Sequence, residues 1–483
     1  MRQLELDPKA GMTLVAPRGM PLGPWRRIAS VSCYNGTYDC ARFDLPVDWL
    51  DPSDEERVVL AIIKLRATER DDYRGPVIFN PSGPRGSGVF ALKDRGDLLQ
   101  TIIGPNNDLI SFDRRGIGAS QSQLWELQDV GIVDAHPGTL YDAFAWAIAF
   151  LQVYTARMMG KSNLFARAGL RKGEVLGFSY GTILGGVFAA MYSDMVKRLA
   201  SDGNVDYQEW HCQTHINFLH DTDKVMCAFY KFCHQAGPTS FDFYAETPKL
   251  IKKRLETLLE HIREPPVIRY ATVLAALEVG DGRPFYNFQT LGTPVCSIEV
   301  IPPNVPHIEE ANSDAFAAIL CADQPLQNDT VEAFAGHVHE LTEISDVAGD
   351  VNAFYLLACV GRTVRPKWRY DGPCEGNTSF PILYVANVAD NIKPLVSATN
   401  NSLRFLGSVV LVQNSYGHTS LSAASACTAE HFHNYFQYGQ LPQPGATCEP
   451  DSKPFQQVSV RGKDDLAVAL HELSRANGVS YQN

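Results

Sequence analysis

The segment Gly177-Phe178-Ser179-Tyr180-Gly181 constrains the fold of this chain more than any other. It follows an apolar run ending at Leu176 and opens a stretch of small residues. This pattern predicts a strand, a sharp turn that carries a serine, and then a helix. The flanking glycines are needed because a Cβ at either position would strike the neighbouring strand or helix. In such a turn the serine backbone is strained and its hydroxyl is exposed above the sheet.

Two later segments supply the partners that a nucleophilic serine needs. One apolar run leads to Asp390, and a second one leads to His418. The chain order serine, aspartate, histidine is that of α/β-hydrolases and differs from the orders on unrelated serine-protease folds. We therefore expect Ser179 to be the nucleophile, His418 its general base, and Asp390 the acid that orients the imidazole. The structural alternatives are a helix cap for Ser179 or Asp390 and an ordinary packing role for His418.

Composition places the chain among soluble globular enzymes. Its 483 residues can bury one large core together with an inserted subdomain, and 45% hydrophobic with 20% charged residues is an ordinary balance. A formal net charge of −12 disfavours nucleic acid or an anionic membrane as a partner. No apolar run is long enough to span a bilayer. The start of the chain lacks the apolar core of a secretory signal, so we expect a cytoplasmic protein, or a secreted one if this N-terminus is incomplete.

Eleven cysteines complicate that expectation. Cys33 and Cys40, and likewise Cys427 and Cys448, are spaced like local disulfide pairs flanked by turn residues. The odd number leaves at least one thiol free. We interpret this pattern as an inheritance from secreted relatives, or as a chain that is missing its leader.

The order of apolar and helical patterns predicts an α/β fold, a mostly parallel central sheet covered by helices on both faces. We expect strands at 58–65, 76–80, 109–113 and 174–178, a crossing helix at 141–159, and a helix behind the serine turn at 184–199. Between the serine and its partners the pattern becomes helical, with helices expected at 223–235, 249–262 and 329–344. An insertion at that place becomes a lid over the serine.

The predicted domain boundaries follow from this pattern. They are an N-terminal arm at 1–30, the first part of the hydrolase core at 31–203, a helical lid at 204–375, the second part of the core at 376–450, and a C-terminal tail at 451–483.

Four blocks together resemble one family. They are Asn80-Pro81-Ser82-Gly83-Pro84-Arg85-Gly86-Ser87-Gly88, the segment 113–120 with the pattern D-x-R-G-x-G-x-S, the turn at 177–182, and the stretch 381–448. The chain resembles the tripeptidyl aminopeptidase-like and prolyl iminopeptidase-like serine hydrolases of the α/β-hydrolase superfamily, in particular the fungal members. The resemblance implies an oxyanion hole made by the backbone N–H of Tyr180 and one from Ser82 or Gly83.

Several departures from the family pattern lie near the mouth of the expected site. Ser82 and Arg85 replace glycines of the oxyanion loop. Arg85 is either a solvated loop residue or a ligand for a substrate carboxylate. The segment Asp390-Asn391-Ile392-Lys393-Pro394 replaces the usual D-P-x-T-P. We interpret Asp113, Arg114 and Arg115 as structural residues that pin the turn below the site through ion pairs. Peptide specificity therefore does not simply carry over from the family.

Three functions remain open from the sequence. The first is a serine hydrolase resembling aminopeptidases that release short N-terminal peptides or proline, acting on a small-molecule or short peptide substrate. The second is an intracellular esterase, lactonase or amide hydrolase that acts on a specialised metabolite. The third is a catalytically silent binding protein on a hydrolase fold.

The sequence implies no cofactor. Neither the histidine pair of the lid, His211 and His215 with Cys212 beside it, nor the cluster at 337–340 offers a complete set of metal ligands. An aminopeptidase needs lid acids to bind the substrate ammonium, and the lid offers several. These candidate acids are Glu209, Asp221, Asp223 and Glu278.

Overall fold

A computed structural model gives the fold of this chain. It describes residues 30–46, 57–120 without 82, 85 and 116, 172–239 without 213, 243–263, 313–326, 330–360, 366–454 without 367, 368 and 453, and 465–479. The predicted arm at 1–30, except for its last residue, and the predicted helix at 141–159 lie outside the described residues.

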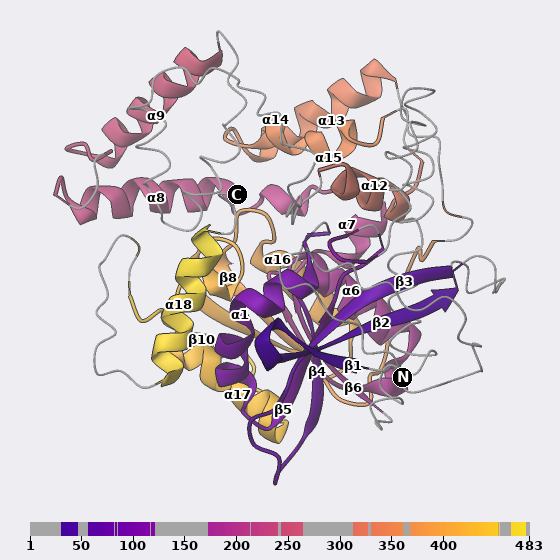
Figure 1. The fold of residues 1–483 in the computed structure, drawn as a ribbon. Coiled ribbons are helices and arrows are strands. Elements are labelled where there is room, and N and C mark those ends of the chain that lie inside the picture. Colours follow the sequence, from indigo (N-terminus) through magenta and orange to yellow (C-terminus); the bar gives the residue numbers. More distant parts are fainter. Residues whose placement is uncertain are drawn as a thin grey trace, which may run out of the picture.

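A ten-stranded sheet forms the centre of the described chain (Figure 1). Its strands are β1 (Ser30–Cys33), β2 (Tyr38–Pro46), β3 (Arg57–Leu65), β4 (Gly75–Asn80), β5 (Asn107–Phe112), β6 (Gly173–Phe178), β7 (Val196–Asp202), β8 (Leu383–Ala389), β9 (Val409–Tyr416) and β10 (Thr447–Cys448). Their order is β1-β2-β3-β5-β4-β6-β7-β8-β9-β10. The pairs from β1 to β5 are antiparallel, and every pair from β5 to β10 is parallel. The predicted mostly parallel sheet is confirmed.

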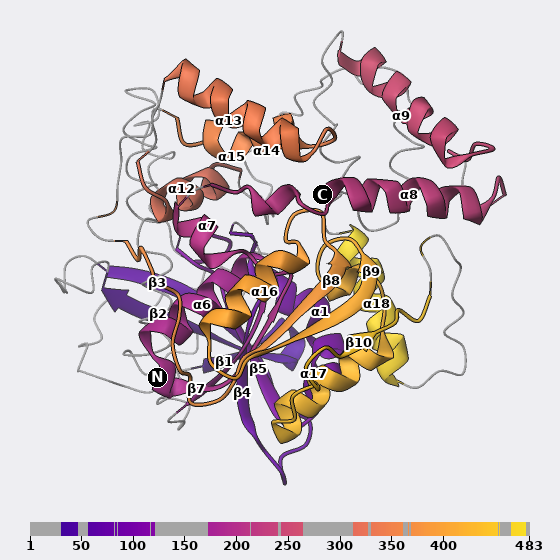
Figure 2. The ribbon, with the colours of Figure 1, turned by 180° about the vertical axis from the view of Figure 1, so that it is seen from behind.

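Helices cover both faces of the sheet (Figure 2). One face packs against α1 (Gly88–Ile103), α17 (Ala426–Tyr438) and α18 (Asp465–Val479), and the other against α6 (Tyr180–Met191) and α16 (Leu395–Arg404). Side chains of one strand alternate between the two cores, as β4 shows: Val77 and Phe79 enter the core under α1, and Ile78 enters the core under α6. The predicted C-terminal tail contains α18, which contacts α1 and α17.

The predicted strands match β3 to β6 within one or two residues at each end. The helix predicted at 184–199 is wrong in its bounds, because α6 begins at Tyr180 and ends at Met191. Residues 196–199 belong instead to β7, which is buried between β6 and β8. The strand β7 reads V-K-R-L-A-S-D and shows no period-two alternation, so its sequence pattern does not separate it from the helix before it.

Between β7 and β8 the described chain is helical and lies at one end of the sheet (Figures 1 and 2). Its elements are α7 (Tyr207–Cys212), the 3₁₀ turn η4 (Asn217–Leu219), α8 (Thr222–Ala236), α9 (Pro248–Arg263), α12 (Ser313–Asp323), α13 (Val331–Ile344), α14 (Gly349–Asn352) and α15 (Phe354–Leu357). The helices predicted at 223–235, 249–262 and 329–344 agree with α8, α9 and α13 within two residues.

Three disulfides join parts of the described chain. The two predicted pairs, Cys33–Cys40 and Cys427–Cys448, are confirmed. A third disulfide, Cys321–Cys359, links α12 to the residues after α15 and was not predicted. Among the described residues the free cysteines are Cys212, Cys227, Cys233 and Cys374. No helix in the described part of the chain is both long and apolar enough to cross a bilayer.

Candidate active site

Ser179 lies in the turn between β6 and α6, in a backbone conformation that L-residues rarely adopt. Its φ is 52° and its ψ is −117°, and its side chain is 5% exposed. A Cβ on Gly177 would lie 2.5 Å from the carbonyl oxygen of Gly181, and a Cβ on Gly181 would lie 2.8 Å from the carbonyl oxygen of Asn80. Both positions therefore need glycine. The predicted strand, serine turn and helix are confirmed, including the reason for the glycines. The prediction that the serine hydroxyl is exposed above the sheet is wrong, because Ser179 is buried in this structure.

Backbone and side-chain hydrogen bonds hold this strained turn. The Ser179 N–H donates to the carbonyl of Asp202 at 2.9 Å. The Ser179 carbonyl accepts from the backbone N–H of Thr182 at 2.9 Å and from the Thr182 hydroxyl at 2.6 Å. Tyr180 is the first residue of α6, so its N–H belongs to a helical turn whose donors have no acceptor within the helix. Such a group favours negative charge nearby.

Asp390 and His418 form a buried pair at the carboxyl ends of β8 and β9. The Nδ1 atom of His418 lies 2.8 Å from Oδ2 of Asp390 and 3.1 Å from Oδ1. The same carboxylate accepts backbone N–H bonds from Ile392, Lys393 and Thr419. Asp390 is fully buried and His418 is 3% exposed. This pairing fixes the orientation of the imidazole and places the Nδ1 proton on the carboxylate side.

The opposite ring nitrogen of His418 remains available. Within the described residues its Nε2 is buried and has no hydrogen-bond partner. The segment Asp202-Gly203 lies between the serine turn and this ring: Asp202 accepts from the Ser179 N–H, and a Cβ on Gly203 would lie 3.1 Å from Cε1 of His418. The residues predicted as nucleophile, acid and base thus stand at the carboxyl ends of β6, β8 and β9, strands that are neighbours around β7.

A second buried carboxylate, that of Asp202, was not predicted from the sequence. It accepts from the backbone N–H of Ser420 at 3.0 Å and from the Ser420 hydroxyl at 2.6 Å. Because its backbone carbonyl binds Ser179, Asp202 connects the serine turn to the loop that follows His418. Burial raises the pKa of Asp202 to about 7, against the lowering effect of the Ser420 hydrogen bonds. Because residues 196–199 were expected in a helix, Asp202 was not recognised as the last residue of a strand.

The raised pKa of Asp202 makes stability fall with rising pH. The folded chain keeps a proton on Asp202 that the unfolded chain has lost, so this contribution is fully present below about pH 4 and is lost as pH rises through about 7. We expect Asp202→Asn to remove this slope, an effect of up to about 4 kcal/mol for a shift of about three pKa units. Urea unfolding of both proteins at intervals from pH 4 to pH 8 measures it. The exposed Asp194→Asn serves as the control, and equal slopes for all three proteins would contradict the assignment.

Asp113 and Arg114 hold the loop before α1 through hydrogen bonds to its backbone and side chains. Asp113 accepts from the Ser87 hydroxyl at 2.6 Å and from the N–H groups of Val89 and Ala119. Arg114 donates to the side chain of Asn80 and to the carbonyl of Gly86. These hydrogen bonds agree with a structural role for Asp113 and Arg114 and anchor the two ends of the loop 80–88. The predicted ion pairs stay a prediction.

Of the residues predicted for the oxyanion hole, the structure describes Tyr180 and Gly83. Gly83 has a φ of 130°, a conformation that favours glycine. Ser82 and Arg85 lie outside the described residues.

Lys393, one of the departures from the family pattern, is buried where the loop after Asp390 meets η4. Its Nζ lies 3.1 Å from the ring centroid of Phe218 in η4, and burial lowers its pKa to about 7. Lys393 thus supports Asp390 through its backbone N–H while its side chain contacts the lid. A cation over an aromatic face in a desolvated place stabilises the contact between these two parts.

The lid acids named from the sequence differ in their surroundings. Asp221 forms an ion pair with Lys224, and Asp223 accepts from the Ser345 hydroxyl at 2.5 Å. Glu209 on α7 is half-buried and accepts from the backbone N–H of Asn217 at 2.8 Å. Burial raises the pKa of Glu209 to about 7. Glu278 lies outside the described residues.

The described cysteine and histidine clusters do not suit a metal ion. The Nε2 atom of His211 lies 3.5 Å from the sulfur of Cys374, whereas that of His215 lies 2.7 Å from the side-chain nitrogen of Gln324. The two lid histidines therefore have separate partners. Cys427, His431 and Cys448 lie close together, but the disulfide already joins the two sulfurs.

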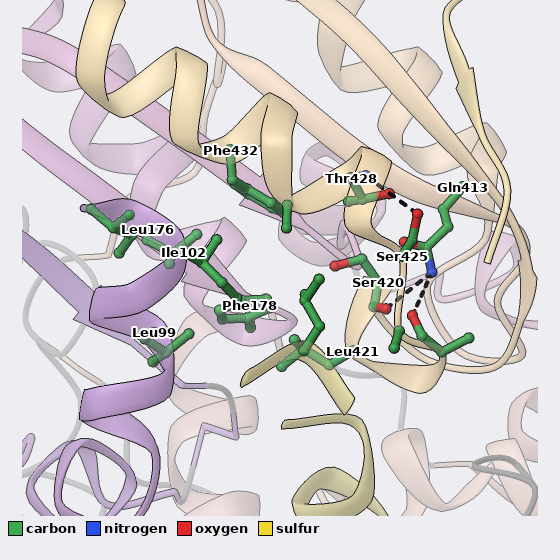
Figure 3. A pocket seen from close by; sticks show the side chains of 15 residues that line it. Leu99, Ile102, Leu176, Phe178, Gln413, Ser420, Leu421, Ser425, Thr428 and Phe432 are labelled. Carbon is green, nitrogen blue, oxygen red and sulfur yellow. Dashed lines mark hydrogen bonds between the residues drawn. The ribbon is translucent and has the colours of Figure 1, made fainter. Parts of the chain in front are cut away.

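A small cavity lies on the opposite side of the sheet from α6, under the loop that follows His418 (Figure 3). Its volume of about 20 Å³ suits about one water molecule and excludes a substrate. Gln413 lines it and donates to the carbonyls of Ser420 and Ala423, which fixes the course of this loop. The cavity therefore belongs to the support of the histidine loop and does not form a substrate site.

Comparison with known proteins gives three findings. Residues 345–448 match the sequence profile of the α/β-hydrolase family described as TAP-like protein. The serine protease Hip1 of Mycobacterium tuberculosis is 27% identical over 189 residues, which are 35% of this chain and 36% of that protein. The tripeptidyl aminopeptidase of Streptomyces lividans is 26% identical over 220 residues, 41% of each chain. Over these segments the chain is similar to a tripeptidyl aminopeptidase and to a serine protease. The resemblance predicted from the four blocks is confirmed.

The matches cover well under half the length of these relatives. The solved structure of proline iminopeptidase from Mycobacterium smegmatis is 13% identical, covers 83% of this chain and 100% of that chain, and has a TM-score of 0.34. The α/β-hydrolase fold follows from the sheet order, the serine turn after β6 and the family match at 345–448, which includes β8, β9 and the Asp390–His418 pair.

Proposed function

We propose that this protein is a serine hydrolase in which Ser179, His418 and Asp390 form the catalytic triad. The observation that carries the proposal is the buried His418–Asp390 pair, which lies at the same end of the sheet as the strained Ser179 turn and in which His418 Nε2 has no hydrogen-bond partner among the described residues. A serine hydroxyl is a poor nucleophile at neutral pH and needs a base oriented by a third group. The relatives named as serine protease and tripeptidyl aminopeptidase support the same reaction class.

The proposed reaction has two acyl-transfer steps. In the first, His418 Nε2 takes the proton of the Ser179 hydroxyl, the oxygen attacks the substrate carbonyl, and the imidazolium returns the proton to the leaving amine or alcohol. Asp390 stabilises the charged imidazole throughout. In the second step, water attacks the Ser179 ester with the same base, which releases the acid and restores the serine. The N–H groups of Tyr180 and of Ser82 or Gly83 stabilise the oxyanion, and the loss of one such donor costs about 3 kcal/mol.

The substrate that the relatives favour is a peptide with a free N-terminus, from which a short peptide or proline is released. Glu209 is the described lid acid best suited to an ammonium group, because its carboxylate accepts a backbone N–H bond, whereas Asp221 already pairs with a lysine and Asp223 already binds a serine hydroxyl. The altered oxyanion loop and acid loop separate this chain from the usual family pattern. An ester, lactone or amide of a specialised metabolite is therefore the competing substrate class in the test below.

Labelling with a fluorophosphonate probe, followed by intact mass, tests the reaction class. We expect one adduct on the wild-type protein and none on Ser179→Ala, because only an activated serine attacks the probe. The exposed Ser32→Ala is the control and should label like the wild type. A folded protein without an adduct would favour the silent binding protein. Tripeptidyl and prolyl anilides tested beside simple aryl esters then separate peptidase from esterase, since ester cleavage without anilide cleavage excludes the peptidase.

A further inference from the structure

A groove of about 480 Å³ runs between the lid and the ends of β8 and β9. One wall is a single face of α8, which contacts β8. Figures 1 and 2 both place this helix over the ends of the two strands. The other wall is made by the last residues of β8 and by Tyr416 at the end of β9. None of the residues that line the groove makes the hydrogen bonds that hold the Ser179 turn.

The groove adjoins the acid and the histidine of the proposed triad. Ala389, in the wall made by β8, directly precedes Asp390, and Tyr416 stands two residues before His418. A hydrogen bond of 3.0 Å from the N–H of Gly417 to the carbonyl of Ala389 joins the two strand ends there. In acyl transfer the histidine gives its proton to the leaving group, so this half of the substrate departs on the histidine side. The groove therefore lies beside the two strand ends that carry the acid and the histidine of the proposed triad.

The lining of the groove combines aromatic rings with ammonium groups. The rings of Phe232 and Tyr416 meet edge to face, with centroids 5.7 Å apart. Lys224 and Lys231 lie along the α8 wall, and both are exposed. The only lining acid among the described residues is Asp223, whose carboxylate is bound by the Ser345 hydroxyl at 2.5 Å.

The two lysines differ in their partners. Lys224 pairs with the buried Asp221. Lys231 has no carboxylate within ion-pair distance among the described residues, and its Nζ lies 6.0 Å from the Phe232 ring centroid. An ammonium group that lies near an aromatic ring and forms no ion pair complements a ligand that carries a carboxylate.

We propose that this groove is the leaving-group subsite and that it selects leaving groups carrying a carboxylate, which Lys231 binds with help from Lys224. The inference rests on the proposed serine hydrolase function and adds to it the chemistry of the departing half of the substrate. For a peptide, that carboxylate is either an acidic side chain or the terminal α-carboxylate of the departing segment.

Matched chromogenic substrates test the proposal without knowledge of the natural one. The 4-nitrophenyl ester or 4-nitroanilide of one acyl group is compared with its 3-carboxy-4-nitro counterpart. We expect Lys231→Met to lower kcat/KM for the carboxylated substrate about three- to tenfold, since an exposed ion pair contributes modestly. The neutral substrate should change less than twofold. Added salt should reduce the wild-type preference, because solvent-exposed charges are screened.

Two further variants provide a charge reversal and a control outside the groove. Lys231→Glu should reverse the preference against the carboxylated substrate, whereas Lys253→Met, an exposed lysine on α9 outside the groove, should behave like the wild type. Equal losses on both substrates, or no change in the ratio, would overturn the proposal. Probe labelling of Ser179 is measured in every variant: intact labelling without discrimination rejects the subsite alone, and absent wild-type labelling rejects the hydrolase.

The two sources of the carboxylate give separate results once a cleaved peptide is known. Three peptides share the acyl half and differ in the departing half, which ends in a free α-carboxylate, in an amide, or in an amide after an acidic residue. Lys231→Met should weaken cleavage of the first peptide if the groove binds the terminus, and of the third if it binds a side chain. Equal effects on all three, including the uncharged amide, contradict the proposal.

Discussion

Replacing His418 by alanine is expected to reduce turnover about 10⁶-fold, the scale seen when the histidine of a serine triad is removed. The structural reason is that His418 connects the acid Asp390 with the nucleophile Ser179 in the proposed triad. Its Nδ1 is held at 2.8 Å from Asp390, and its Nε2 is the base for Ser179. Steady-state rates on the substrate found in the screen, together with the rate of fluorophosphonate labelling, measure the loss, and both should fall together.

Two controls distinguish lost chemistry from lost structure in this experiment. Exogenous imidazole should restore part of the rate of His418→Ala, since the removed ring leaves space beside Gly203. His433→Ala removes a half-buried histidine of α17 whose Nδ1 contacts the carbonyl of Ile102, away from the serine turn. It should keep activity within about threefold, as expected for a substitution outside the reacting groups. A His418→Ala enzyme within tenfold of the wild type would reject the base assignment.

The serine turn could be predicted from the sequence because its constraints are local. Gly177 and Gly181 must lack a Cβ for reasons found within a few residues of Ser179, and such a pattern survives in the sequence as a short motif. Asp390 and His418 could be found because each follows an apolar strand and precedes the loop that carries it. The chain order serine, aspartate, histidine then predicts that Asp390 is the acid and His418 the base.

Asp202 could not be found in the same way, because its importance depends on contacts between distant segments. The strand β7 is short, its sequence V-K-R-L-A-S-D does not alternate between apolar and polar residues, and nothing local to it identifies a strand placed between β6 and β8. The partner of Asp202, Ser420, is 218 residues further along the chain. The Cys321–Cys359 disulfide escaped prediction for a similar reason, since helical packing brings the two sulfurs together and no turn signal flanks them.

Replacing Asp390 by asparagine is the second substitution with a large expected effect, a fall in kcat of about 10⁴-fold. Asparagine keeps an acceptor for the N–H groups of Ile392 and Lys393, so the loop retains much of its support. However, its amide group can donate to Nδ1 of His418, which stabilises the tautomer with the proton on Nε2. That nitrogen then cannot act as the base for Ser179. Rates and labelling measured from pH 6 to pH 10 should remain far below the wild type throughout.

Asp202→Asn provides the matched control, because Asp202 is also a buried aspartate that holds the loop after His418. Its side chain binds Ser420 and does not hydrogen-bond to the imidazole in the described structure. If Asp390 acts through the tautomer and charge of His418, Asp202→Asn should lose less than about tenfold in kcat, far less than Asp390→Asn. Equal losses in the two variants would mean that both acids only support the loop. Asp390 would then lose its catalytic role, and Ser179 would need another source of activation for the histidine.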